Sequence, residues 1–182
     1  MNLKYIQGDL IEAALDGRLN VIAHQANCFC KGRRGIAHQI FGRFPSLKLA
    51  DDRTEIGDRD KLGTITHSFC YRPNIPKSNF LWGFNLYGQY HFDQKSPEYG
   101  TRYPALQSAL ESMRQMIILR KTLYWNYEDV LNIGFPLIGC GVAGGDWGIV
   151  EEMIKEVFEG LPNVEIYIYT LDKLEGKDYV DR

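Results

Sequence analysis

The sequence lacks the features that mark a metal centre or a membrane protein. Its 182 residues include four histidines, which are dispersed without ligand spacing, and no Cys-x-x-Cys pair. The four cysteines are Cys28, Cys30, Cys70 and Cys140. We therefore expect no metal site and no cofactor. No stretch approaches the ~20 apolar residues that cross a bilayer, and residues 1–10 contain no apolar run typical of a secretion signal. We expect a cytoplasmic protein with reduced thiols and no membrane partner.

The sequence also lacks an excess of either charge. Lysine and arginine total 21, aspartate and glutamate total 23, and the net charge is −2. This balance argues against a strongly basic nucleic-acid-binding surface, so an anionic ligand would be held by local donors. There is no Gly-Lys-Ser/Thr loop typical of nucleotide triphosphatases. Hydrophobic residues make up 45% of the chain, enough for the core of one domain.

Predicted strands and helices alternate along the chain. Short apolar, β-branched stretches predict strands, and apolar residues three and four positions apart predict helices. The expected strands are residues 3–6, 20–25, 63–69, 80–87, 130–138 and 164–170, and the expected helices are 11–15, 36–44, 103–119 and 147–158. The alternation predicts an α/β fold of three layers, with a central mixed sheet and helices on both faces. Ligands of such sheets bind beyond the carboxyl ends of the strands.

Other segments are expected to lie outside this framework. Pro45 is expected to end the second helix. Residues 51–60 are highly charged and predict a solvated surface, and residues 173–182 predict a loose polar tail. The domain is expected to span residues 1–172.

The loop at residues 138–147 joins a predicted strand to a predicted helix and contains four glycines within seven residues. Glycine allows unusual backbone angles and close approach of a ligand, so consecutive amides can form an anion-binding nest. The dipole of the following helix would add to this, and Asp146 can cap that helix. An ordinary tight turn would need only one glycine, so we favour the binding interpretation.

An earlier loop, residues 24–37, has the same strand-to-helix placement. Asn27 can donate and accept hydrogen bonds, which suits sugar hydroxyls. Gly35 opens the helix and can present amides to a phosphate. Arg33 and Arg34 can add positive charge there, although two solvated surface arginines are the simpler interpretation.

Several segments in this order resemble the macrodomain family. They are Tyr-Ile-Gln-Gly-Asp-Leu at 5–10, His-Gln-Ala-Asn at 24–27, Gly-Ile-Ala at 35–37, Pro-Leu-Ile-Gly-Cys-Gly at 136–141, Gly-Asp-Trp at 145–147 and the strand at 164–169. The match covers nearly the whole chain. It is most similar to the branch that processes ADP-ribose 1″-phosphate and related adducts, whose small bacterial and phage members carry a segment like Gly-Thr-Arg-Tyr at 100–103.

The resemblance implies a protein that binds ADP-ribose or its derivatives. Asp9 would accept a hydrogen bond from the adenine amino group beside the Leu10 amide, although Asp9 can also cap a helix. Asn27 would hold the distal ribose. One phosphate would lie against Gly35, Ile36 and Ala37. The second phosphate and the distal ribose would contact the later loop at Gly139, Cys140, Gly141, Val142, Ala143 and Gly144.

The resemblance further implies hydrolysis of an adduct at the terminal ribose. We expect His24 as base or nucleophile and Asp146 as acid, facing each other across that ribose; a core histidine and a helix cap are the alternatives. Cys140 is a further nucleophile candidate, although a small buried residue between glycines is the better interpretation. A related branch uses a lysine after a central strand and an aspartate in the glycine loop. Residues 85–89 contain no lysine and Ala143 replaces the aspartate, so a covalent lysine mechanism is not expected.

Two further functions remain open. The protein can be a non-catalytic module that senses ADP-ribose, or a hydrolase that removes ADP-ribose from a modified protein or nucleic acid. A binder of single-stranded RNA or poly(ADP-ribose) is a more distant alternative, which the near-neutral charge disfavours. Turnover of candidate adducts separates these alternatives.

Overall fold

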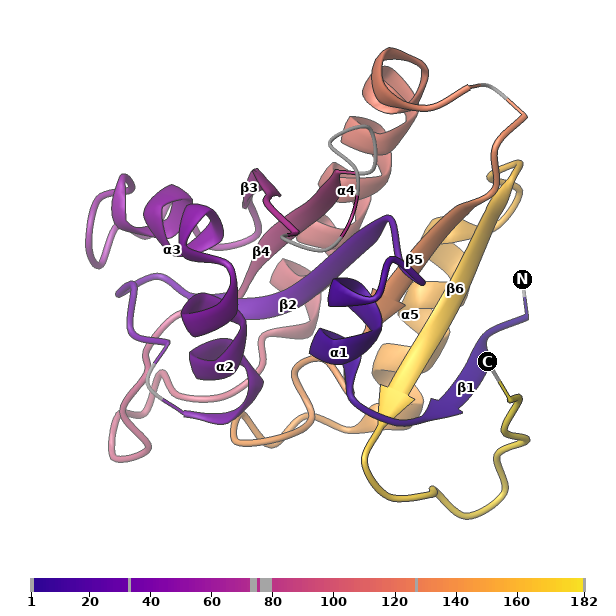
Figure 1. Cartoon of the computed structure of the whole chain (residues 1–182). Coiled ribbons are helices and arrows are strands. Elements are labelled where there is room, and N and C mark those ends of the chain that lie inside the picture. Colours follow the sequence, from indigo (N-terminus) through magenta and orange to yellow (C-terminus); the bar gives the residue numbers. More distant parts are fainter. Residues whose placement is uncertain (1, 33, 73–74, 76–79, 127, 182) are drawn as a thin grey trace.

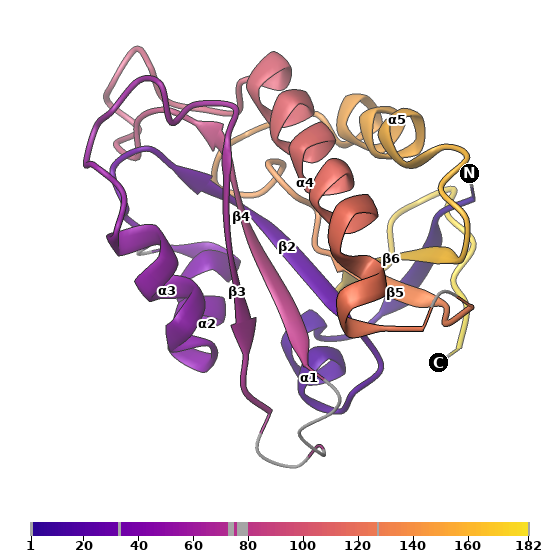
Figure 2. The same ribbon diagram turned by 90° about the horizontal axis from the view of Figure 1, so that it is seen from above.

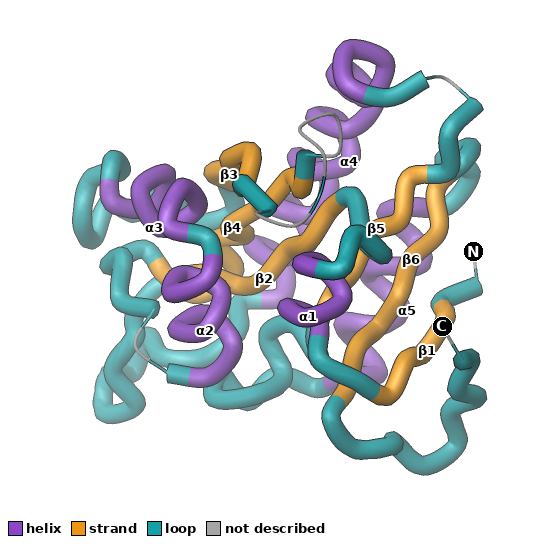
Figure 3. Tube along the Cα trace, viewed as in Figure 1, coloured by secondary structure: helices purple, strands orange, loops and turns teal. Residues whose placement is uncertain are grey.

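A computed structural model describes residues 2–32, 34–72, 75, 80–126 and 128–181. Its centre is a six-stranded sheet in the order β1-β6-β5-β2-β4-β3 (Figure 1, Figure 3). The strands are β1 (Lys4–Gln7), β2 (Val21–Asn27), β3 (Ile65–Cys70), β4 (Leu81–Gln89), β5 (Leu131–Phe135) and β6 (Val164–Thr170). All neighbours pair in parallel except β3, which runs antiparallel to β4. The sheet is therefore mixed, as the sequence predicts.

Helices cover both faces of the sheet (Figure 2). One face carries α1 (Leu10–Leu15), α2 (Gly35–Arg43) and α3 (Pro45–Asp52), and the other carries α4 (Tyr103–Tyr124) and α5 (Trp147–Phe158). Alternate residues of β2 supply the two cores: Ile22 packs on the α1–α3 side, while Val21 and Ala23 pack on the α4–α5 side. The predicted three-layer α/β/α architecture is confirmed.

The region after Pro45 differs from the prediction. Pro45 ends α2 as expected, but it also occupies the first turn of α3, where its missing N–H and fixed φ are tolerated. The stretch 51–60 was expected to be solvated. Instead Asp51 is only 1% exposed and accepts a hydrogen bond from the Tyr87 hydroxyl at 2.9 Å. The prediction is wrong for Asp51, whose carboxylate is satisfied by a buried partner from β4, whereas residues 52–60 are exposed or half-buried.

The C-terminal tail was predicted to be loose, and the structure corrects this. The backbone N–H of Val180 donates to the Tyr5 carbonyl at 2.9 Å, and the Tyr179 and Tyr5 rings are 5.8 Å apart. Lys177 Nζ lies 2.5 Å from Glu151 Oε2. The tail thus covers the outer edge of β1, which would otherwise present unpaired backbone groups. Among the described helices, none is long and apolar enough to span a bilayer.

Candidate functional site

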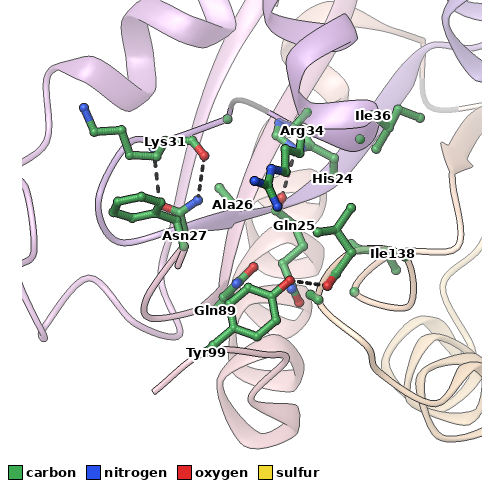
Figure 4. A pocket seen from close by; sticks show the side chains of 18 of the residues that line it. His24, Gln25, Ala26, Asn27, Lys31, Arg34, Ile36, Gln89, Tyr99 and Ile138 are labelled. Carbon is green, nitrogen blue, oxygen red and sulfur yellow. Dashed lines mark hydrogen bonds between the residues drawn. The ribbon is translucent and has the colours of Figure 1, made fainter. Parts of the chain in front are cut away.

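A groove of about 600 Å³ lies at the carboxyl ends of β2, β4 and β5 (Figure 4). The earlier loop and the start of α2 form one wall, the loop after β5 forms another, and residues 92–95 with Tyr99 form a third. The predicted site residues that line it are His24, Asn27, Gly35, Ile36, Ala37, Gly139, Gly141, Val142 and Ala143. The fold therefore brings the two predicted loops to one cavity.

The start of α2 offers the groove's most favourable place for an anion. The N-cap residue Arg34 makes no side-chain capping hydrogen bond. The first amides of a helix have no acceptor within the helix, so those of Gly35, Ile36 and Ala37 are available to a ligand. The helix dipole adds partial positive charge at the same point. Arg34 is exposed and lines the groove; Arg33 lies outside the described residues.

The first amides of α5 are capped by a side chain, and the contribution of its dipole to phosphate binding stays a prediction. Asp146 Oδ1 accepts hydrogen bonds from the amides of Gly148 at 2.7 Å and Ile149 at 3.4 Å. Asp146 thus caps the helix, as its position predicts, and it does not line the groove. A different helix, α2, provides the uncapped N-terminus.

Thr101 fixes the shape of the glycine loop from the side. Its hydroxyl donates to the Gly139 carbonyl at 2.5 Å and accepts from Gln25 Nε2 at 3.1 Å. Its backbone N–H donates to the Ala143 carbonyl at 3.2 Å. Sequence reasoning did not assign this role, although the Gly-Thr-Arg-Tyr segment was recognised.

Two tyrosines flanking Thr101 extend the same support. The Tyr99 hydroxyl donates to the Val142 carbonyl (Figure 4), and the Tyr103 hydroxyl accepts a hydrogen bond from the Asp146 amide at 2.9 Å. Residues 99–103, which we call the clamp segment, therefore hold the loop at several points along its length. This support keeps loop amides in place before a ligand arrives.

The glycines of the later loop serve different purposes. Gly139 has φ +73°, and a Cβ there would lie 2.8 Å from Gln25 Oε1. A Cβ on Gly145 would lie 2.6 Å from the Gly139 carbonyl oxygen. Both positions need glycine for internal packing. A Cβ on Gly141 would meet nothing within 4 Å, so this groove-lining glycine leaves room for a ligand.

Asn27 shapes the earlier loop with its side chain (Figure 4). Its Oδ1 accepts from the amides of Phe29 at 3.1 Å and Lys31 at 3.3 Å, and its Nδ2 donates to the Lys31 carbonyl at 3.0 Å. The amide nitrogen carries two hydrogens, so one remains for a ligand.

His24 lines the groove, but its side chain is buried. The residue is 0% exposed; Nε2 is 2.7 Å from Asn85 Oδ1 and Nδ1 is 3.0 Å from the Gln25 carbonyl. Burial lowers the pKa of His24 to about 4, so the imidazole is neutral near pH 7. Asp146 caps α5, and His24 is hydrogen-bonded to Asn85 and Gln25; their predicted arrangement on opposite sides of the ribose stays a prediction.

Three other predicted contacts lie away from the groove lining. Asp9 Oδ1 accepts from the amides of Ile11 at 2.7 Å and Glu12 at 3.2 Å, so Asp9 caps α1. Leu10 is buried within α1. Gly144 has φ +70° and does not line the groove. Their predicted ligand contacts remain untested by this geometry.

Cys140 is also outside the groove lining. Its Sγ lies 3.3 Å from the Ile138 carbonyl, and burial raises the pKa of its thiol to about 11. A protonated thiol is a poor nucleophile, so this environment supports the simpler interpretation of Cys140 as a packing residue.

The sequence did not identify several groove residues, because only the tertiary fold brings them to the cavity. Asp93 and Lys95 line the cavity from a segment interpreted as a polar loop, and Lys31 lines it from the earlier binding loop without a predicted role. Phe92 is 41% exposed and stacks on His91 with ring centroids 5.0 Å apart. The sequence offers Phe92, with Tyr87, Tyr90 and His91, as an aromatic group that can stack on adenine or ribose, although loop packing is the simpler interpretation for most of the four.

No family model matches the chain, but sequence relatives cover most of it. An uncharacterized 17.5 kDa protein of Enterobacteria phage T4 is 30% identical over 158 residues, or 85% of this chain and 88% of that protein. The human ADP-ribose glycohydrolase OARD1 is 32% identical over 169 residues, or 93% of this chain and 91% of that protein. A DNA ADP-ribosyl glycohydrolase of Thermus aquaticus is 24% identical, and the match spans only 41% of that protein.

Solved structures share the fold. The macrodomain of Mycobacterium tuberculosis DarG superimposes with a TM-score of 0.68 at 21% identity, over 92% of this chain and 97% of that chain. Thermosipho africanus DarTG, solved in complex with ADP-ribose, gives a TM-score of 0.66 at 16% identity, over 96% of this chain and 43% of that chain.

Proposed function

The chain belongs to the macrodomain family, and we propose from this that its groove binds ADP-ribose. The observation that carries the proposal is the uncapped start of α2 facing the glycine loop across one cavity. A diphosphate has two anionic groups, and backbone amides on opposite walls suit both. The available volume of about 600 Å³ falls within the range of small-molecule sites.

The ligand would lie along the groove with its diphosphate between the two loops. The terminal ribose would lie at Asn27, which keeps one amide hydrogen for a hydroxyl. The adenine would extend towards the start of α1, where Asp9 uses Oδ1 for capping and can offer Oδ2 to the adenine amino group.

Isothermal titration calorimetry with ADP-ribose tests binding directly. We expect saturable heat with one site per chain, and weaker or no binding of adenosine, which lacks the diphosphate. Absence of heat together with absence of a thermal shift at excess ADP-ribose would reject the proposal.

We further propose that the protein hydrolyses adducts at the terminal ribose, including ADP-ribose 1″-phosphate. The loop amides can stabilise negative charge that develops on the substrate. Two carboxylates, Asp51 and Asp93, line the groove, and only Asp93 is exposed; it is the accessible group for activating water. The names of two relatives, an ADP-ribose and a DNA ADP-ribosyl glycohydrolase, support this reaction class.

A sensing role without turnover is the second candidate, favoured by the burial of His24 and by the use of Asp146 as a helix cap. Incubation with ADP-ribose 1″-phosphate, ADP-ribosylated DNA and an ADP-ribosylated glutamyl peptide separates the candidates. Release of phosphate or free ADP-ribose from one substrate, lost in Asp93→Asn, supports the hydrolase. Tight binding without release of any product supports the sensor.

A further inference from the structure

A buried amine lies against a thiol next to the groove, and the proposed function uses neither group. Lys61 is only 5% exposed, and its Nζ is 3.1 Å from Cys30 Sγ. The same ammonium is 3.1 Å from the Cys28 carbonyl, 4.0 Å from Asp51 Oδ1 and 4.6 Å from the Tyr87 ring centroid. The fold thus holds one lysine nitrogen and one cysteine sulfur in contact.

Among the four cysteines, Cys30 has the environment that favours reaction with an oxidant. Reactive cysteines are typically found beside a positively charged side chain, and here Lys61 Nζ contacts the sulfur directly. Cys30 also lines a second pocket of about 430 Å³, beside α2 and α3, which gives a small oxidant access. Burial raises the pKa values of Cys28, Cys70 and Cys140 to about 11, so these thiols stay protonated near pH 7.

The side chains around Cys30 are poorly suited to binding a metal ion. Cys30, Asp51 and Asp52 do place possible ligand atoms within 4.8 Å of one another. However, the Lys61 ammonium already contacts the sulfur and lies 4.0 Å from the Asp51 carboxylate. A divalent cation would be repelled by this charge.

We propose that hydrogen peroxide links Cys30 to Lys61 through a covalent sulfur–nitrogen bond. The Cys30 thiolate attacks peroxide, the O–O bond breaks, and the sulfur becomes a sulfenic acid. The displaced hydroxide takes a proton from the Lys61 ammonium, which yields water and a neutral amine. The amine nitrogen then attacks the sulfur and expels a second water molecule. Sulfur is oxidised by two electrons and peroxide is reduced to water.

The Cys30–Lys61 bond would affect the groove through the residues that follow Cys30 in the sequence. Lys31 and Gly32 directly follow Cys30 and line the groove, and Asn27 is hydrogen-bonded to Lys31 on both backbone groups. A covalent bond is shorter than the 3.1 Å contact, so its formation displaces Cys30 and its neighbours. This second consequence rests on the proposed function: ADP-ribose affinity should fall by about threefold or more on oxidation and recover on reduction.

Mass spectrometry of the full chain tests the bond independently of ligand binding. After treatment with dilute hydrogen peroxide, we expect a product that has lost two hydrogen atoms, with three of the four thiols still open to alkylation. Peptide mapping should join the Cys30 and Lys61 peptides, and dithiothreitol should restore the original mass. Loss of two thiols per chain would instead indicate a disulfide and overturn the proposal.

Matched variants locate the reacting atoms. Cys28→Ser should still form the product, and Cys30→Ser should not. Lys61→Arg keeps the positive charge but lacks the amine, so it should accumulate a sulfenic acid at Cys30 that dimedone traps. Loss of two hydrogens in Lys61→Arg would exclude Lys61 as the partner. If the link forms and ADP-ribose affinity does not change, the regulatory consequence is wrong.

Discussion

Gly35 and Val142 approach each other closely where the two loops meet: a Cβ built on Gly35 would lie 3.6 Å from Val142 Cγ2, ordinary van der Waals contact. The two residues belong to loops that follow different strands, β2 and β5, and these strands are neighbours in the sheet. Gly35 has φ +60°, a conformation that glycine adopts without strain. The approach of these loops is what makes one groove from two turns.

Alanine substitutions at two glycines of the later loop should have different effects, one on stability and the other on ligand binding. Gly139→Ala places a Cβ at φ +73° and 2.8 Å from Gln25 Oε1, so we expect a loss of about 1–3 kcal/mol in the free energy of unfolding. Gly141→Ala meets no neighbour within 4 Å and should fold normally while weakening ADP-ribose binding. Urea unfolding and calorimetry measure the two effects. Wild-type stability in Gly139→Ala would contradict the assigned packing.

Asp146→Ala should act through the helix cap. Loss of the hydrogen bonds to Gly148 and Ile149 should lower the free energy of unfolding by about 1 kcal/mol, with ADP-ribose affinity little changed. Asp146→Asn keeps a capping oxygen and serves as the control. If Asp146→Ala instead abolishes turnover without loss of stability, the acid role predicted from the sequence is correct.

Thr101→Val should weaken ligand binding more than it destabilises the fold. Valine has a similar shape but cannot donate to the Gly139 carbonyl or accept from Gln25 Nε2. We expect a loss of about 1 kcal/mol in binding, near fivefold in Kd, because the glycine loop becomes less ordered. Thr101→Ser, which keeps the hydroxyl, should bind as wild type. Equal affinity in the valine and serine variants would rule out a role for this hydroxyl.

His24 should make the protein less stable in mild acid. Its pKa falls from 6.5 to about 4 in the folded protein because burial disfavours the charged ring. Above pH 6.5 the His24 ring is neutral in both the folded and the unfolded protein, and its full contribution to the free energy of unfolding is present. As the pH falls towards 4, the ring binds a proton only in the unfolded chain, and this contribution is lost. The contribution that disappears is about 3 kcal/mol at most.

Comparison with His24→Gln isolates this effect from other titrating groups. His67, whose pKa is also lowered by burial, and Asp51, whose pKa is raised by burial, contribute to both proteins. Denaturant unfolding between pH 7 and pH 4.5 should therefore give a shallower pH dependence for the variant. Parallel profiles would show that His24 does not remain neutral in the folded state.

The local pattern of the sequence is sufficient for much of the framework. The predicted bounds of α5 and β6 agree with the structure, because the apolar periodicity and flanking glycine or turn residues are local signals. The two strand-to-helix loops are found in the same way. Their common location follows from the parallel sheet, whose strand ends share one edge.

Tertiary structure alone decides which groups meet there. Asp51, in an otherwise accessible charged stretch, is buried because Tyr87 and Lys61 provide partners. His24 and Asp146 are suitable partners by residue type, yet each makes its hydrogen bonds with other residues. The side chain of Asp146 caps the first amides of α5, whereas the N-cap residue of α2 makes no side-chain capping hydrogen bond. Residue type and spacing determine the fold class and the candidate loops, whereas hydrogen-bond partners depend on long-range packing, which periodicity does not encode.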